Sequence, residues 1–128
     1  HSDTASGANL TIVVAPSFRG RISTVNKKAE TIVTPGESVD VLVTERGICV
    51  NPMKPELEEK LIKAGLNVKK IEDLQQEVEK ILGPPAPIKY SDRIVGIVEY
   101  RDGTIIDVIK PQMTNIWRWG VSSRNSLP

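Results

Sequence analysis

The polar residues best suited to substrate chemistry lie in the first nine positions of the chain. His1, Ser2 and Asp3 are consecutive, and Asn9 comes directly before an apolar run. The imidazole of His1 could hydrogen-bond a substrate carboxylate, and Asn9 could face a ligand or form a turn. Serine and aspartate also cap helices readily, so Ser2 and Asp3 have a structural alternative. On residue type alone, these four residues could either contact a ligand or serve only the local turn.

Two arginines, Arg19 and Arg21, flank Gly20 shortly after the same apolar run. An arginine guanidinium binds a carboxylate through two parallel hydrogen bonds, which a lysine cannot supply. The preceding run, residues 10–15, is typical of a strand in a parallel sheet, and open α/β sheets bind ligands beyond the carboxyl ends of such strands. We therefore expect Arg19 and Arg21 to contact a substrate that carries carboxylates. The alternative is that they form ion pairs with nearby surface acids.

The composition argues against several classes of function. The chain has 17 basic and 16 acidic residues, so no strong electrostatic field favours nucleic acid or an anionic membrane. Cys49 is the only cysteine and cannot form an internal disulfide, which favours a reducing cytoplasm. Because His1 is the only histidine, we predict no metal site. No apolar run approaches the roughly 20 residues of a membrane helix.

The elements that would position these residues alternate between strands and helices. At 128 residues, the chain is long enough for one domain with a substantial core. Apolar, β-branched runs predict strands, the first of them covered on both faces, and a Pro-Gly turn is expected at residues 34–37. Asp40 and Glu45 flank the strongest run, and Asp40 is expected to be a structural hydrogen-bonding group. The predicted strands are residues 10–15, 22–25, 30–33, 39–44 and 48–50.

Two helices and a hairpin follow these strands. Helical periodicity predicts a helix from Pro55, capped by Gly65, and a second over residues 71–82, stopped by Gly83. The second helix should turn Leu74, Val78, Ile81 and Leu82 inward, and its charged residues should form a solvated face. Asp102-Gly103 between two β-branched runs predicts a hairpin over residues 94–109. The order of elements indicates an α/β fold with an open mixed sheet and flanking helices.

Six short segments follow one another in a specific order along the chain: 1–4 (HSDT), 7–10 (GANL), 19–21 (RGR), 34–36 (TPG), 39–44 (VDVLVT) and 100–103 (YRDG). This ordered set resembles the C-terminal part of the citrate lyase alpha subunit family, which is similar to the family I coenzyme A transferases. The resemblance runs in the same order from His1 to about Ile109, and implies that residues 1–109 are the C-terminal part of a coenzyme A transferase-like half-domain. Residues 110–128 form an atypical tail with Trp117 and Trp119, which we expect to be poorly ordered.

The resemblance implies an acyl transferase that exchanges acetyl for citryl on a thiol carrier. The carrier would be coenzyme A or a dephospho-coenzyme A-type prosthetic group on an acyl carrier protein, and the partners would be the citrate lyase beta and gamma subunits in an oligomeric complex.

In the relatives that carry the resemblance, a nucleophilic glutamate and a Gly-rich loop precede a His-Ser-Asp segment like residues 1–3. The resemblance therefore implies that the nucleophile lies upstream of His1, and that His1, Ser2 and Asp3 lie near the substrate or carrier. Arg19 and Arg21 would likewise contact the substrate or the carrier. On that alignment, the fragment alone would be inactive. Activity of the chain alone would instead make Glu37 and Glu45 the first candidates.

Two alternatives remain open at this point. The chain could belong to an acyl-coenzyme A:carboxylate transferase that uses another acid in place of citrate. It could also be a non-catalytic assembly piece that holds neighbouring subunits through the hairpin edge or through the Trp117 and Trp119 tail.

Overall fold

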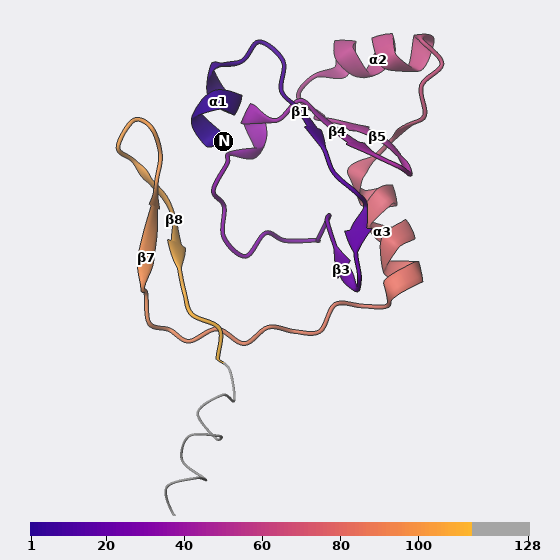
Figure 1. Cartoon of the computed structure of the whole chain (residues 1–128). Coiled ribbons are helices and arrows are strands. Elements are labelled where there is room, and N and C mark those ends of the chain that lie inside the picture. Colours follow the sequence, from indigo (N-terminus) through magenta and orange to yellow (C-terminus); the bar gives the residue numbers. More distant parts are fainter. Residues whose placement is uncertain (114–128) are drawn as a thin grey trace, which may run out of the picture.

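The computed structural model describes residues 1–113, which form three short α-helices, one 3₁₀ turn and eight strands (Figure 1). Several strands have only two or three residues, so much of the chain runs as extended links between them. In order, the elements are α1 (Ser2–Gly7), β1 (Ile12–Val14), β2 (Phe18–Arg19), β3 (Ile22–Ser23), η1 (Gly36–Ser38), β4 (Val41–Thr44), β5 (Gly47–Val50), α2 (Pro55–Lys63), β6 (Val68–Lys69), α3 (Ile71–Leu82), β7 (Gly96–Glu99) and β8 (Ile105–Ile109).

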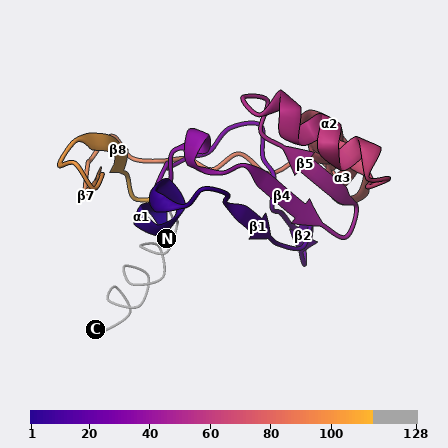
Figure 2. The same ribbon diagram turned by 90° about the horizontal axis from the view of Figure 1, so that it is seen from above.

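A four-stranded sheet in the order β1-β4-β5-β6 organises the fold. Strands β1 and β4 are parallel, β4 and β5 form an antiparallel hairpin, and β5 and β6 are parallel. Strands β1 and β4 are parallel because the chain returns between them through the β2–β3 hairpin and the link that ends in η1. The helix α2 carries the chain from β5 to β6. This mixed, open arrangement confirms the α/β fold predicted from the sequence. Both views place α2 and α3 far from the β7–β8 hairpin, with α1 closer to that hairpin (Figures 1 and 2).

The helices form where the sequence pattern predicts them. Pro55 occupies the first turn of α2, where the missing N–H costs nothing, and Gly83 ends α3 with φ of 81°. Leu74 and Val78 of α3 are fully buried. The prediction that Ile81 points inward is wrong, because its side chain is 51% exposed. Leu82, the next residue, packs against the buried cluster of Cys49, Leu74 and Val78, so the inward face of α3 includes Leu82 and not Ile81.

The core is smaller than the chain length suggests. Among residues 1–113, the buried apolar side chains are Ala5, Val41, Cys49, Leu74 and Val78. The expectation of a substantial core is therefore wrong, and so is the expectation that the first strand is covered on both faces. In β1, Ile12 is 53% exposed and Val14 is 77% exposed. The physical reason is that Ile12 and Val14 point to the same face of this edge strand, and β4 is the only described element that makes extensive contact with β1.

One predicted strand does not form. Residues 30–33 have no regular structure, and the backbone N–H of Ile32 instead donates a 2.7 Å hydrogen bond to the carboxylate of Asp107 in β8. This bond ties the long link after β3 to the β7–β8 hairpin. The following Pro-Gly sequence forms the 3₁₀ turn η1 rather than a type II turn, since Gly36 lacks a positive φ.

The hairpin prediction for residues 94–109 is confirmed as strands β7 and β8. Its turn has Gly103 at φ of 86°, and Asp102 accepts hydrogen bonds from the N–H and hydroxyl of Thr104. The backbone pairing continues past Ile109, because Tyr90 bridges Gln112. The two tryptophans of the tail lie outside the described residues. No helix within residues 1–113 is long and apolar enough to cross a membrane.

Candidate functional site

The first candidate residues lie in the short helix α1. His1 stands at its N-cap position without a side-chain capping bond, and Asp3 lies in its first turn. His1 and Asp3 are exposed, whereas the hydroxyl oxygen of Ser2 is buried without a hydrogen-bond partner in the described part of the chain. The capping alternative for Ser2 and Asp3 therefore does not account for their placement. Their geometry leaves His1 and Asp3 accessible to a ligand.

Contacts from two distant segments hold α1 in place. The hydroxyl of Ser6 is hydrogen-bonded to the phenol of Tyr100 and lies 3.3 Å from the hydroxyl of Ser38 in η1. Thr11 donates its hydroxyl to the carbonyl of Ala5 at 3.1 Å. Ser6, Ser38 and Tyr100 line a polar cavity of about 250 Å³, to which Glu37, Asp40 and Lys54 also contribute. Ser38 of η1 therefore belongs to a cavity beside α1.

A second hollow runs from α1 along the exposed side of β1. It has a volume of about 440 Å³ and is lined by His1, Thr4 and the side chains of β1. Leu10, just before the strand, also lines it and is 49% exposed. Asn9 lies in the exposed link between α1 and β1 and does not line either hollow. The groove is therefore mainly apolar, with His1 at one end.

Arg19 and Arg21 lie on the small β2–β3 hairpin, with Gly20 at φ of 58° in its turn. Both arginines are exposed, and neither forms an ion pair with a carboxylate of residues 1–113. The ion-pair alternative for them is therefore not what the structure shows. The hairpin follows β1, whereas α1 precedes it, so the arginines and His1 lie at opposite ends of that strand in both views (Figures 1 and 2).

The carboxyl ends of the parallel strands β1 and β4 meet at one edge of the sheet. Ser17 and the arginine hairpin follow β1 at this edge, and Glu45 and Arg46 follow β4. Ligands of open α/β sheets bind outside the carboxyl ends of the strands. The structure therefore places Arg19 and Arg21 at the edge where the sequence predicted them. We refer to Ser17, Arg19, Arg21, Glu45 and Arg46 as the carboxyl-edge cluster.

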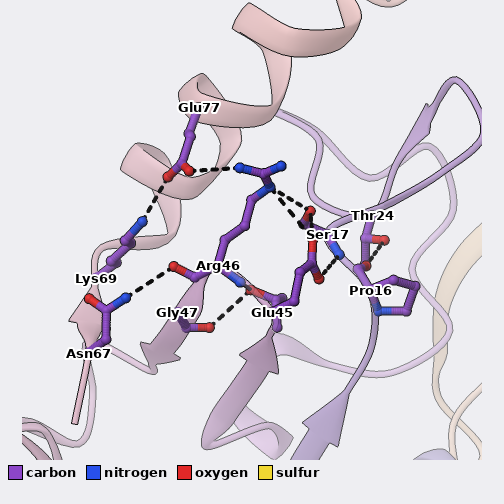
Figure 3. Close-up of polar contacts among 10 residues, drawn as sticks. Pro16, Ser17, Thr24, Glu45, Arg46, Gly47, Asn67, Lys69 and Glu77 are labelled. Carbon is purple, nitrogen blue, oxygen red and sulfur yellow. Dashed lines mark hydrogen bonds and ion pairs between the residues drawn. The ribbon is translucent and has the colours of Figure 1, made fainter.

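Three residues that sequence reasoning did not connect form the base of this cluster. Ser17 is fully buried. The Glu45 carboxylate accepts two hydrogen bonds from Ser17, one from the backbone N–H at 2.9 Å and one from the side-chain hydroxyl (Figure 3). Arg46 donates to the Ser17 hydroxyl at 3.1 Å. The hydrogen bonds from Ser17 hold the pKa of Glu45 below its ordinary value. The adjacent opposite charges in the tight turn after β4 were the sequence signal for this arrangement.

Arg46 also joins the cluster to α3. Its guanidinium lies 5.7 Å from the centre of the Phe18 ring and donates to Glu77 at 3.0 Å. Lys69 of β6 reaches the other oxygen of Glu77 at 2.8 Å (Figure 3). Lys69, and after it Arg46, keep the pKa of Glu77 low. Glu77 and Arg46 thus neutralise each other, which leaves Arg19 and Arg21 as the cations of the cluster available to a ligand.

Residues 1–113 contain no group of three or more His, Cys, Asp or Glu side chains that could hold a metal ion. The chemistry these residues offer is binding of anions through guanidinium, hydroxyl and imidazole groups.

The chain is similar to known proteins over most of its length. The family model described as "Citrate lyase, alpha subunit (CitF)" matches residues 1–112. The citrate lyase alpha chain of Klebsiella pneumoniae is 56% identical over 110 residues, which are 86% of this chain and 22% of that protein. The alpha chain of Escherichia coli K12 is 50% identical over 109 residues, or 85% of this chain and 21% of the relative.

A solved structure is also similar. A Streptococcus mutans protein described as an alpha subunit of citrate lyase, crystallised in complex with citrate, superposes with a TM-score of 0.85 at 45% identity. The match covers 89% of this chain and 22% of that one. The chain thus spans about a fifth of the length of the relatives it matches. Because the family model covers nearly the whole chain, the chain belongs to the citrate lyase alpha subunit family.

Proposed function

We propose that this chain forms part of an acyl transferase that exchanges acetyl for citryl on a thiol carrier. The reaction would convert an acetyl thioester and citrate to a citryl thioester and acetate. Arg19 and Arg21 would bind carboxylates of citrate that do not react. His1, Ser2, Asp3 and Asn9 would face the substrate or the carrier from the opposite end of β1. The observation that carries the proposal is the pair of exposed arginines at the carboxyl edge of the parallel strands.

The exchange requires a carboxylate that carries the acyl group. A free carboxylate such as citrate is a poor acyl acceptor, and an enzyme glutamate can split the exchange into easier steps through mixed anhydrides. Each anhydride forms when a carboxylate oxygen attacks an acyl carbon and expels either the thiolate or another carboxylate. We place this glutamate in a segment upstream of His1.

Glu45 is poorly suited to this task, because both of its oxygens accept hydrogen bonds from Ser17. A carboxylate that nucleophilically attacks a thioester needs a free lone pair directed at the acyl carbon. Glu37 lies in η1, just before β4, and lines the polar cavity beside α1, whereas the arginine hairpin follows the other end of the parallel strands. Neither Glu45 nor Glu37 is therefore our first candidate for the nucleophile.

The wider assembly belongs to the same proposal. The carrier would be coenzyme A or the dephospho-coenzyme A-type group on an acyl carrier subunit, and the citryl thioester would pass to a beta subunit for cleavage. The complex would work in the cytoplasm. Cys49 is a buried, free thiol, as a reducing compartment would allow.

The test is citrate-dependent acyl exchange from an acetyl thioester. It compares the 128-residue chain with a chimera in which the 110-residue matched segment replaces its counterpart in the Klebsiella pneumoniae alpha chain. We expect exchange in the chimera and none in the chain alone. Exchange by the chain alone would overturn the upstream nucleophile. A folded chimera that is inactive with citrate and active with another acid would favour the alternative transferase.

One observation favours assembly as a second function. Ile97 and Ile105 on the β7–β8 hairpin are 53% and 60% exposed, which is unusual for apolar side chains on a paired strand. If the hairpin holds a neighbouring subunit, replacing both residues with serine will lower the oligomeric mass of the chimera in light scattering. An unchanged mass together with unchanged exchange would exclude this function for the hairpin.

A further inference from the structure

Ser17 is the point at which the chain leaves β1 and begins the arginine hairpin. Its side chain is fully buried, although it is polar. A buried hydroxyl needs a partner, and the Glu45 carboxylate supplies one while also accepting the Ser17 N–H at 2.9 Å (Figure 3). The carbonyl of Ser17 accepts the N–H of Thr24 at 2.9 Å, on the far side of the hairpin. Ser17 therefore anchors both ends of the arginine hairpin.

The hairpin has little stability of its own. Its two strands have two residues each, paired Phe18 with Ser23 and Arg19 with Ile22. Isolated two-stranded hairpins are at best marginal in water. Ile22 is 74% exposed, and the apolar burial is confined to the base of the hairpin, where Phe18 and Val25 pack against the buried core. The position of Arg19 and Arg21 must therefore depend on the anchors at the base of the hairpin.

Glu45 is the residue that holds this base from outside the hairpin. It lies in the tight turn between β4 and β5. These two strands form a hairpin with four paired residues on each strand, against two on each strand of the arginine hairpin. Arg46, its neighbour in the turn, adds a hydrogen bond to the Ser17 hydroxyl and a contact with the face of the Phe18 ring. The turn thus fixes the base of the arginine hairpin relative to β4 and β5.

We propose that Glu45 is a positioning residue for citrate, acting through Ser17 on Arg19 and Arg21. This inference rests on the proposed function, in which the two arginines bind carboxylates of citrate. Glu45 itself would touch neither substrate. Because its side chain is 52% exposed, the carboxylate contributes little apolar burial, and its loss should leave the sheet folded. The effect of removing Glu45 should therefore fall on the arginine hairpin.

The test uses the active chimera and measures KM for citrate, KM for the acetyl thioester and kcat separately. Glu45→Ala should raise KM for citrate about tenfold, since a lost charge-assisted contact is worth a factor of this order. The KM for the thioester and kcat should change by less than about twofold, because the lost interaction concerns binding of one substrate. Glu45→Gln should restore most of the citrate affinity, because its amide can accept the Ser17 N–H and donate to the hydroxyl.

A matched control is Glu59→Gln on α2, whose side chain is 71% exposed and pairs only with Lys63 of the same helix. It should leave all three constants unchanged. An unchanged KM for citrate in Glu45→Ala would overturn the proposal. So would equal increases in both KM values, because they would indicate a general structural defect.

The double variant Arg19→Met/Arg21→Met separates this inference from the proposed function. If it leaves KM for citrate unchanged, the arginines do not bind citrate, and both proposals fail. If it raises KM for citrate while Glu45→Ala does not, only the positioning inference fails. Should Glu45→Ala prevent folding of the chimera, hydrogen exchange on the 128-residue chain decides the question. The Thr24 amide should then exchange faster in Glu45→Ala while Cys49 in β5 keeps its protection, and loss of both would overturn the proposal.

Discussion

The carboxylate of Asp40 accepts a 2.7 Å hydrogen bond from the backbone N–H of Thr11, at the point where the parallel strands β1 and β4 begin. The other oxygen of Asp40 lies 3.2 Å from the ammonium of Lys54, just before α2. The backbone carbonyl of Asp40 accepts the N–H of Asn51, after β5. Asp40 therefore joins the edge strand, the central hairpin and the entry to α2. This confirms the prediction that Asp40 is a structural hydrogen-bonding group.

Replacing Asp40 with asparagine should destabilise the chain. Asp40 is buried, and an asparagine amide would place an N–H group toward Lys54, which would lose its partner. We expect the free energy of unfolding at pH 7 to fall by about 1–3 kcal/mol. Chemical denaturation of the 128-residue chain measures it. As a control, Glu59→Gln removes an exposed ion pair with Lys63 on α2. It should lower the free energy of unfolding by less than about 0.5 kcal/mol. Equal losses in the two variants would contradict a special role for Asp40.

The contribution of Asp40 should depend on pH. The Thr11 N–H, and to a lesser extent Lys54, hold the pKa of Asp40 below its ordinary value in the folded chain. A group with a lowered folded pKa stabilises the fold above its unfolded pKa, about 3.9 for aspartate, and this contribution disappears as the pH falls through the folded pKa. The difference in unfolding free energy between the unsubstituted chain and Asp40→Asn should therefore be constant from pH 7 to about 5 and shrink below about 4. Denaturation curves at a series of pH values test this, and a difference that grows on acidification would contradict it.

The small core makes single apolar contacts important. Leu74 is fully buried against Cys49 and Val78, whereas Ile81, two turns along the same helix, is 51% exposed. Leu74→Ala should cost about 2–5 kcal/mol of unfolding free energy, since it leaves a cavity. Ile81→Ala should cost less than about 1 kcal/mol. Both variants keep helix propensity high, so thermal or chemical unfolding compares packing alone. Similar losses would mean that α3 packs on the face that includes Ile81.

The structure shows which features of the molecule can be predicted from its sequence and which cannot. The helix α3 and the β7–β8 hairpin were predicted because periodicity, glycine and turn residues are local signals. The exposure of Val14 and the irregular path of residues 30–33 depend on which segments lie beside them, and a single sequence does not encode that directly. In the candidate site, the location of Arg19 and Arg21 was predicted because arginine binds carboxylates and because both residues follow a predicted parallel strand. The Ser17 anchor was not, because a serine after a proline resembles any loop residue.

The last prediction concerns Gly47, which begins β5 directly after the Glu45-Arg46 turn. Its φ of 150° lies in the region that favours glycine, and a Cβ added there would meet Lys69 Cδ at 3.0 Å and the Asn67 carbonyl oxygen at 3.2 Å. Gly47→Ala should therefore destabilise the chain by more than about 1 kcal/mol. The matched control is Gly36→Ala, because a Cβ at Gly36 has no atom within 4 Å and its φ is ordinary.

Gly47→Ala should also act on the carboxyl-edge cluster, since it displaces Lys69, a partner of Glu77 at 2.8 Å. Glu77 would then rely on Arg46 alone, and the pull on Arg46 should loosen its contact with Ser17. Chemical denaturation should show the stability loss, and hydrogen exchange should show faster exchange at Thr24 in Gly47→Ala. Gly36→Ala should change neither readout. If Gly47→Ala is as stable as the unsubstituted chain, the backbone at the start of β5 accommodates a side chain. The turn would then lack the fixed geometry on which the positioning of Arg19 and Arg21 depends.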